Sequence, residues 1–293
     1  MVTLMDGGMG RELARRGVST RTGLWSAQAL IDAPDVVVDT HKDFIAAGAG
    51  IITTNSYSCV PSYLGKVDQA DRYLELAALS GKLARRAVEE SGEELRIAGG
   101  LPPLSESYRA DMVLDDEVAR PIYAALAEAL EPHVDLLLCE TMSSIRESRN
   151  AATEAKAASN GKPVFVSWTL KEEPGAGLRS GESVADAFSA VSDLDLDGYL
   201  FNCTHPDAIE AAISVITGLT DKPTGGYPNR FDVPAGFTLD NEVRVQERKD
   251  FGMEHFVEAA QRCIDRGATL FGGCCGIGPE DIAALRARTV AAL

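Results

Sequence analysis

The chain has 293 residues, of which 45% are hydrophobic and 25% are charged, so it can build the apolar core of an ordinary globular protein. It has no apolar run long enough to cross a bilayer as a helix, which excludes an ordinary membrane span. Its 28 lysines and arginines are outnumbered by 44 aspartates and glutamates, for a net charge of −16. A chain this acidic is repelled by nucleic acids and anionic membranes, so neither is an expected partner.

The N-terminus and the cysteine content bear on the compartment. Residues 1–6 carry no basic flank or cleavage signature, so a secretory signal is not expected. Six cysteines in 293 residues are too few for a disulfide scaffold. We therefore expect a cytoplasmic protein with reduced thiols, in which clustered cysteines bind a metal or take part in catalysis.

Short apolar runs alternate with longer amphipathic stretches along the whole chain, which predicts strands that alternate with helices. Gly48 and Gly267 stand just past two predicted helix ends, where a left-handed backbone conformation is needed. The predicted strands cover residues 2–5, 50–54, 95–99, 134–139, 163–170, 197–202, 223–227 and 268–272. The predicted helices cover residues 34–47, 69–91, 115–131, 143–159, 183–191, 206–219, 250–266 and 279–293.

Eight strands, each followed by a helix, predict an α/β fold of the closed (β/α)8 TIM-barrel type. No linker-like or low-complexity segment divides the chain, so residues 1–293 are expected to form a single domain. An open doubly wound sheet is the alternative. That fold normally has a glycine-rich phosphate turn after its first strand, and residues 6–10 lack the G-x-G-x-x-G spacing.

Three cysteines follow predicted strands at the end of the barrel where chemistry takes place. Cys203 follows the sixth strand, and Cys274 and Cys275 follow the eighth in a Gly-Gly-Cys-Cys-Gly turn. Adjacent cysteines do not easily form an unstrained disulfide with each other. Three thiolates suit zinc (Zn2+) and leave its fourth position open for an incoming thiol. This pattern predicts alkylation of a thiolate.

Other interpretations of the cysteines and of a nearby histidine stay open. Cys139, which follows three leucines, and Cys263 are interpreted as small buried core residues, and Cys59 has no partner pattern. His205 could be a fourth metal ligand, but the proline after it is typical of a helix start. A redox pair or chance clustering is the alternative for the three cysteines themselves.

The most specific motif in the chain combines Asn202-Cys203 with Gly-Gly-Cys-Cys-Gly at residues 272–276. With this combination the chain resembles the homocysteine S-methyltransferase family over essentially its whole length. Further matching motifs occur in the order of the family: Asp6 to Gly10 with Leu13 and Arg16-Gly17, Leu24-Trp25-Ser26, Thr54-Asn55-Ser56-Tyr57, Tyr108-Arg109-Ala110-Asp111, Glu140-Thr141-Met142 and Tyr227-Pro228-Asn229.

The resemblance implies a (β/α)8 barrel with a catalytic zinc ion held by Cys203, Cys274 and Cys275. It also implies that Asp6, after the first strand, and Glu140, after the fourth, bind the amino group of homocysteine. From the residues alone, a pair of carboxylates at the barrel mouth is a sensible site for an ammonium group. Caps and surface ion pairs are the alternative uses for these two carboxylates.

Five further residues complete the expected substrate site. Backbone N–H groups around Gly7 and Gly8 are expected to receive the carboxylate of the amino acid, because glycine permits close approach to the backbone. Tyr57 and Trp25 are candidate walls around the methyl donor, since an aromatic face attracts an onium cation. Core packing is the alternative for both rings. Asn202, beside the first cysteine, is placed at the substrate site with them.

These expectations together describe an enzyme with two small-molecule substrates. It is a zinc-dependent methyltransferase that moves a methyl group from S-methylmethionine or S-adenosylmethionine to L-homocysteine, forming methionine. Betaine is an alternative donor, and another small thiol or a selenol is an alternative acceptor. A protein that stores zinc or senses redox state is the non-enzymatic alternative.

Overall fold

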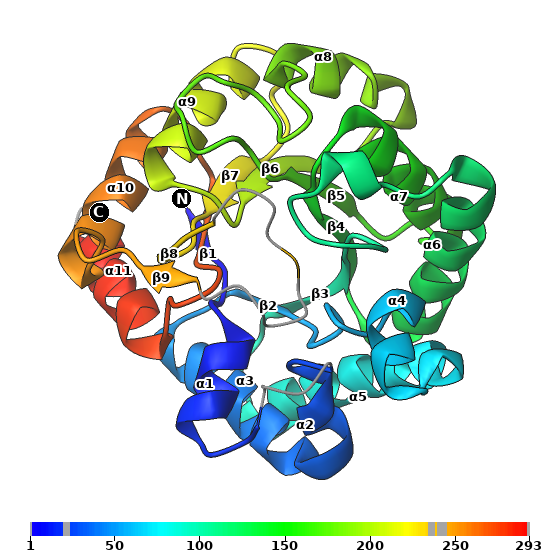
Figure 1. The fold of residues 1–293 in the computed structure, drawn as a ribbon. Helices are drawn as coiled ribbons and strands as arrows, with labels where there is room; N and C mark the ends of the chain where they lie inside the picture. Colours follow the sequence, from blue (N-terminus) through cyan, green and yellow to red (C-terminus); the bar gives the residue numbers. More distant parts are fainter. Residues whose placement is uncertain (1, 20–23, 234–237, 239–244, 292–293) are drawn as a thin grey trace.

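Eight parallel strands form a ring that is surrounded by helices in the computed structural model, which describes residues 2–19, 24–233, 238 and 245–291 (Figure 1). The strands are hydrogen-bonded in the order β1-β10-β7-β6-β5-β4-β3-β2. A parallel bridge between Met5 and Ile51 joins the two end strands and closes the ring. The predicted (β/α)8 barrel is therefore confirmed. Its strands are β1 (Thr3–Leu4), β2 (Ile51–Thr53), β3 (Arg96–Leu101), β4 (Leu136–Met142), β5 (Val164–Trp168), β6 (Gly198–Asn202), β7 (Thr224–Tyr227) and β10 (Leu270–Phe271).

The eight predicted helices all form, with ends within a few residues of those expected. Gly48 and Gly267 have φ values of +103° and +100°, which confirms the left-handed helix ends. The last predicted helix runs to Ala291, and residues 292–293 lie outside the described part of the chain. The helices are α3 (Pro34–Ala47), α5 (Tyr73–Ser91), α6 (Asp116–Leu130), α7 (Ile145–Ala158), α8 (Val184–Ser189), α9 (Pro206–Ile216), α10 (Met253–Asp265) and α11 (Pro279–Ala291).

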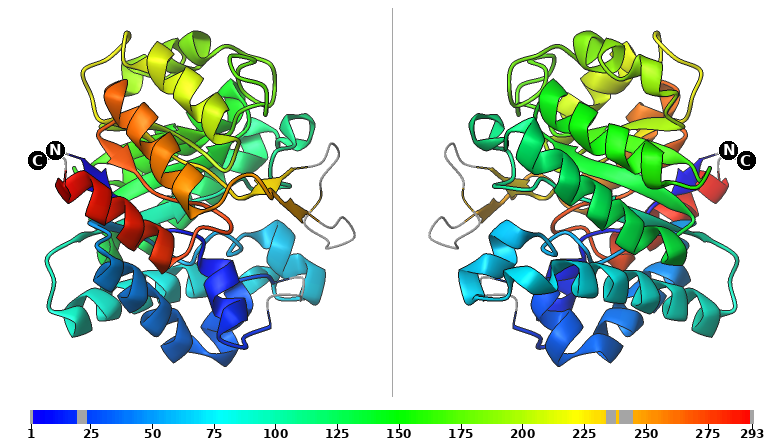
Figure 2. Two further views of the ribbon diagram at one scale, coloured as in Figure 1. Left: turned by 90° about the vertical axis from the view of Figure 1, so that its left-hand side faces the viewer. Right: turned by 90° about the vertical axis from the view of Figure 1, so that its right-hand side faces the viewer.

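Four elements at the barrel mouth were not predicted from the sequence. They are too short for a clear periodic signal, and the first helix begins at a glycine without a side-chain cap. One of the four is a two-stranded hairpin, which lies at the opposite end of the barrel from the two chain termini (Figure 2). The new elements are α1 (Met9–Arg15), α2 (Ala27–Asp32), α4 (Pro61–Leu64) and the hairpin of β8 (Phe231–Asp232) with β9 (Gln246–Glu247).

Two apolar layers hold the barrel together. One fills the inside of the ring with side chains such as Ile51, Leu138 and Leu200, so the barrel interior is a packed core. The other lies between the strands and the helices and contains Cys139 and Cys263, which confirms that these cysteines are core residues. Among the described residues, no helix is long and apolar enough to cross a membrane.

Candidate active site

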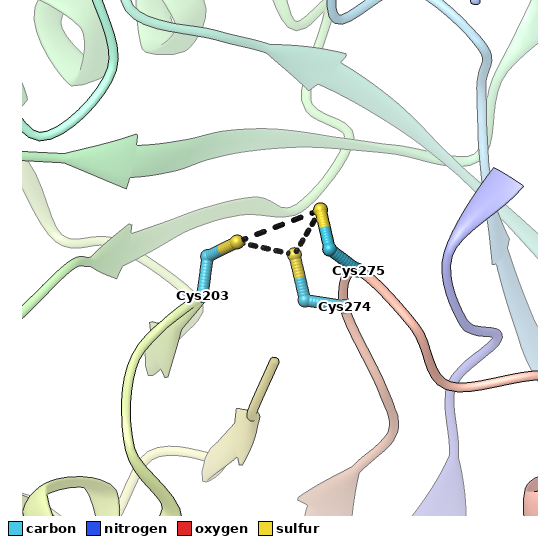
Figure 3. Close-up of side chains that lie close together, drawn as sticks. All are labelled: Cys203, Cys274 and Cys275. Atoms are coloured by element: carbon cyan, nitrogen blue, oxygen red, sulfur yellow. Dashed lines mark hydrogen bonds between the residues drawn. The ribbon is translucent and has the colours of Figure 1, made fainter. Parts of the chain in front are cut away.

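The three predicted cysteines meet at the carboxyl ends of the strands, and their sulfur atoms point toward one another (Figure 3). The Sγ atoms of Cys203 and Cys274 are 2.7 Å apart. The Sγ atom of Cys275 lies 3.9 Å from each of the other two. No disulfide joins them, because all three are free thiols. Cys203 is buried, whereas Cys275 is exposed, so the cluster opens toward solvent on one side.

The strand between the two cysteine loops explains how residues so far apart in sequence meet. In the ring, β7 lies between β6, which precedes Cys203, and β10, which precedes Cys274. The backbone N–H of Cys203 donates to the Tyr227 carbonyl at 3.1 Å, and that of Cys274 donates to the Pro228 carbonyl at 2.8 Å. The Cys275 carbonyl in turn accepts from the N–H of Arg230 at 2.8 Å. The residues that follow β7 thus fix both cysteine loops.

The backbone at Cys203 is held in an uncommon conformation by these contacts. Cys203 has a φ of +52°, in the left-handed region that side chains other than glycine rarely adopt. Such a conformation costs about 1–3 kcal/mol and persists only where surrounding contacts impose it. The strain lies at the residue that turns the chain out of β6 and aims its sulfur at the cluster.

Hydrogen bonds between the sulfurs shift the pKa values of Cys274 and Cys275 in opposite directions. Hydrogen bonds from Cys203 and Cys274 lower the pKa of the Cys275 thiol well below its usual value. The hydrogen bond between Cys274 and Cys203 raises the pKa of Cys274. Cys275 therefore gives up its proton more readily than Cys274. A thiolate with two further thiols beside it is a donor set suited to a soft divalent metal.

The spacing of the sulfurs can be compared with that of a metal site. Sulfurs bound tetrahedrally to zinc at about 2.3 Å lie about 3.8 Å from one another. The two 3.9 Å separations match this spacing, and the Cys203–Cys274 pair would open by about 1 Å. The cluster could thus hold a metal, and the described part of the chain shows no other group of three such ligands.

His205 is not part of the cluster. It is the N-cap residue of α9, and its Nδ1 atom accepts a hydrogen bond from the N–H of Asp207 at 3.2 Å. This confirms the helix start expected from the sequence. The alternative role of His205 as a fourth metal ligand finds no support, because the ring is used to cap its own helix.

Asp6 and Glu140 are two buried carboxyl groups at the mouth, with exposed fractions of 6% and 8%. Asp6 accepts hydrogen bonds from the N–H of Thr53 at 2.7 Å and from its hydroxyl at 3.3 Å. No donor among the described residues reaches the Glu140 carboxylate. An added Cβ at Gly100 would lie 2.5 Å from Glu140 Oε1, so a larger residue there would push this carboxylate out of its place.

Burial shifts both carboxyl groups in the same direction. It raises the pKa of Asp6 to about 7, although the hydrogen bonds from Thr53 oppose the shift. Burial, together with the negative charges of Asp6 and Cys203, raises the pKa of Glu140 to about 8. Two buried carboxyl groups that repel each other favour a cation between them. This electrostatic character fits an ammonium group.

A local irregularity in β4 positions Glu140. The register of β4 against β5 shifts between Cys139 and Met142, and Thr141 has a φ of +61°. Such bulges redirect side chains beside active sites. Asn202 holds the bulge in place, because its Oδ1 atom accepts from the Thr141 N–H at 2.9 Å and its Nδ2 atom donates to the Thr141 hydroxyl at 2.8 Å.

Asn202 and Gly8, both expected at the substrate site, make hydrogen bonds inside the protein. The amide of Asn202 is fully buried and bonded to Thr141 and Ser167, so it supports the site and does not face a substrate. The N–H of Gly8 donates to the Ile277 carbonyl at 2.9 Å, so it already has a partner inside the protein. The sequence suggested a close approach at this glycine, and the close approach is to the cysteine loop.

The contact at Gly8 gives a testable prediction with a matched control. A Cβ at Gly8 would lie 2.7 Å from the Cys274 carbonyl oxygen, whereas a Cβ at Gly10 would meet nothing closer than 3.9 Å. Gly8→Ala is expected to cost about 1–3 kcal/mol of stability and to weaken metal binding by displacing the cysteine loop. Thermal unfolding and metal titration measure both effects. Gly10→Ala, inside α1, should leave metal binding unchanged and should not lower stability, and equal behaviour of the two variants would contradict the prediction.

Tyr57 and Trp25 are both partly buried rings that pack on the core between barrel and helices. The Tyr57 hydroxyl is 2.6 Å from the hydroxyl of Ser107. Its pKa is raised well above the usual value by burial, then by Tyr63 and by the charge of Cys203, so its hydroxyl lies in the field of the site. Trp25 is partly buried, has a φ of +49° and packs on the core between barrel and helices.

Tyr108 is a residue whose position the sequence did not predict. Its hydroxyl lies 2.9 Å from Cys203 Sγ, within hydrogen-bond distance of the cluster. The sequence did mark this residue, because Tyr108-Arg109-Ala110-Asp111 is one of the motifs that match the family. The sequence of the loop after β3 did not indicate that the Tyr108 side chain would contact Cys203.

The chain is similar in sequence to a known family of enzymes. A profile of the homocysteine S-methyltransferase family matches residues 3–289. The chain belongs to the homocysteine S-methyltransferase family. It is therefore a methyltransferase, which sets aside the alternative of a protein that only stores zinc or senses redox state.

The similarity to individual members extends over nearly the whole chain. Homocysteine S-methyltransferase of Escherichia coli is 30% identical and covers 98% of this chain and 95% of its own length. The crystal structure of the homocysteine methyltransferase MmuM from Escherichia coli in its metallated form has a TM-score of 0.82 at 28% identity, covering 98% of this chain and 96% of that one. Selenocysteine Se-methyltransferase of Brassica oleracea var. italica is 26% identical and covers 98% of this chain and 88% of its own length.

Proposed function

We propose that this methyltransferase moves a methyl group from an onium donor to the thiol of L-homocysteine, forming methionine. The observation that carries the proposal is the cluster of three cysteine sulfurs at the barrel mouth of a chain from this family. In this proposal residues 1–293 act as one homocysteine-binding barrel domain. The cytoplasm is the compartment that suits it, since the cluster works only while its thiols stay reduced.

Zinc is the metal we propose for Cys203, Cys274 and Cys275. Thiolates are soft ligands, and a site with three protein ligands leaves one position for a substrate. When bound, zinc lowers the pKa of the homocysteine thiol and fixes its sulfur as the nucleophile. The chain itself contributes the rigid placement of three sulfurs, because the segment after β7 holds both cysteine loops.

Asp6 and Glu140 are the proposed partners of the homocysteine ammonium group. Glu140 is a buried residue whose carboxylate accepts no hydrogen bond from the described residues, and Asp6 is kept in place by Thr53. Asn202 contributes indirectly by holding the bulge that aims Glu140. Among the glycines of the first loop, Gly7 stays a candidate for contact with the substrate carboxylate through its backbone.

The donor we propose is S-methylmethionine or S-adenosylmethionine. Tyr57 and Trp25 are the proposed aromatic walls, because the face of an aromatic ring attracts a sulfonium cation. The net charge of −16 also favours the approach of a cationic donor. Betaine, a quaternary ammonium compound, is the alternative donor with the same chemistry.

A second acceptor is favoured by one comparison. The chain is similar to a selenocysteine Se-methyltransferase over nearly its whole length. A selenol would occupy the same open position as a thiol and would have the same need for an ammonium site. We therefore include selenocysteine, besides homocysteine, among the acceptors to be tested.

Metal removal and a donor panel test the proposal together. The protein is treated with a chelator, and methionine formation from homocysteine is followed with S-methylmethionine, S-adenosylmethionine, betaine or methylfolate. We expect activity with a sulfonium donor that is lost on chelation and restored by one equivalent of zinc. Activity that persists without metal would refute the zinc site. Turnover of selenocysteine alone, with none of homocysteine, would refute the acceptor.

A further inference from the structure

The hydroxyl of Tyr108 makes a close contact with a proposed metal ligand that the proposed function does not use. It lies 2.9 Å from the Sγ atom of Cys203. The side-chain amide of Asn229 also faces this sulfur, but its Nδ2 atom is 3.9 Å away. Tyr108 is therefore the nearer of the two polar groups that the loops around the cluster direct at Cys203.

The chemistry of the Cys203 sulfur and the Tyr108 hydroxyl decides which of them donates the hydrogen bond. A cysteine that binds a metal is a thiolate, and a thiolate can only accept a hydrogen bond. A phenol has an ordinary pKa of about 10 and keeps its proton at neutral pH. The hydrogen bond therefore runs from the Tyr108 hydroxyl to the Cys203 sulfur whenever a metal is bound.

The surrounding structure fixes the ring of Tyr108 over the cluster. Its backbone has a φ of +66°, a strained conformation that the neighbouring contacts must impose. The guanidinium of Arg179 lies over the ring, 5.0 Å from its centre. Arg179 is in turn held by Glu172 at 2.7 Å, and Glu172 also pairs with the buried Arg248 at 2.7 Å. Side chains from separate loops thus hold one hydroxyl.

The negative charge of the metal-bound cluster is what this hydrogen bond would partly offset. Three thiolates and a divalent metal carry a net charge of −1, and an incoming thiolate would make it −2. A donor to one ligand sulfur withdraws charge from it and fixes its orientation. The site then keeps its metal while it gains a fourth sulfur.

We propose that Tyr108 is a positioning residue of the metal site, whose hydroxyl donates to the Cys203 thiolate and stabilises the three-cysteine set. This inference rests on the proposed metal site. Tyr108→Phe removes only the hydroxyl and keeps the ring beneath Arg179. Zinc affinity is expected to fall about 10- to 100-fold, the usual effect of losing a partner that supports a metal ligand.

Cobalt substitution supplies a second readout that does not depend on activity. Loss of a donor to Cys203 leaves the sulfur richer in electrons, so the sulfur-to-cobalt charge-transfer band of Tyr108→Phe should move to longer wavelength. Tyr123→Phe is the matched control, because Tyr123 is a buried tyrosine whose hydroxyl instead contacts Met142 Sδ at 4.0 Å. The control should keep the zinc affinity and the spectrum of the unaltered protein.

The outcomes separate this inference from the proposed function. If the unaltered protein binds neither zinc nor cobalt, the metal site itself fails. If it binds both, and Tyr108→Phe has the same affinity and the same charge-transfer band, the role of Tyr108 is refuted and the metal site stands. A change in the cobalt d–d bands would mean that the phenol oxygen is itself bonded to the metal, which would also overturn the assignment. Melting temperatures of the metal-free variants check that both remain folded.

Discussion

Cys203→Ala is expected to abolish turnover and metal binding while the barrel stays folded. Cys203 lies 3% exposed at the end of β6 and supplies one of the three sulfurs of the cluster. Two sulfurs from adjacent residues on one loop cannot complete the set. Since loss of a mere supporting partner already costs about 10- to 100-fold in metal sites, loss of a ligand should lower zinc affinity and turnover by more than about 100-fold.

A matched variant separates the effect on the metal from the effect on packing. Cys263→Ala removes an equally buried thiol from α10, in the layer between strands and helices. It should lose some stability and keep one zinc per chain together with full turnover. Metal content, turnover and circular dichroism are measured on both variants. Full zinc stoichiometry and activity in Cys203→Ala would remove this cysteine from the ligand set.

Glu140→Gln is expected to make the protein more stable at alkaline pH and a poorer binder of homocysteine. The folded carboxyl has a pKa of about 8, mainly because of burial, and it regains an ordinary pKa on unfolding. Between roughly pH 4.5 and 8 the native state therefore holds more protons than the unfolded state, so stability falls as pH rises through this window. The full shift corresponds to on the order of 5 kcal/mol, and a glutamine does not titrate.

Glu140→Gln is expected to weaken the binding of homocysteine, although it raises the stability of the protein. An ammonium group is attracted to the carboxylate and not to a neutral amide, so KM for homocysteine should rise at least about 10-fold in Glu140→Gln. Because Asp6 and Glu140 ionise near pH 7 and 8, affinity for homocysteine in the unaltered protein should increase from pH 6 to 8.5. The variant should lose much of that increase. Steady-state kinetics give KM for both proteins, and calorimetric titration of homocysteine across this pH range gives the change in affinity.

Glu147→Gln is the control that separates stability from binding. Glu147 is also buried, and burial raises its pKa to about 7, but its carboxylate accepts from the Ser143 N–H and hydroxyl at the start of α7. Its substitution should flatten the pH dependence of stability without changing KM. An unchanged KM in Glu140→Gln as well would remove Glu140 from the proposed homocysteine site.

The barrel and the identity of the cysteine cluster could be read from the sequence because their signals are local. The alternation of apolar runs with amphipathic stretches marked all eight strands and helices. Gly48 and Gly267 marked helix ends by their residue type alone. Once the strands were placed, parallel closure required Cys203, Cys274 and Cys275 to face the same end of the barrel.

The fine structure of the site depends on contacts between loops that the sequence does not reveal. The N–H of Gly8 and the amide of Asn202 were expected to serve the substrate, and both are bonded inside the protein instead. A glycine or an asparagine has the same local preference in either use, so only the partner across the barrel decides. The partners here are the Ile277 carbonyl and Thr141, from distant parts of the chain.

The sequence by itself determined the strand–helix alternation, the closed barrel and the three sulfurs that a soft metal requires. Only the tertiary structure decided how the sulfurs are spaced, that a bulge at Thr141 aims Glu140, and that Tyr108 touches Cys203. Thr141, Tyr108 and Cys203 all adopt positive φ values, which their residue types disfavour. Such conformations are imposed by packing between βα loops, and no local sequence preference predicts them.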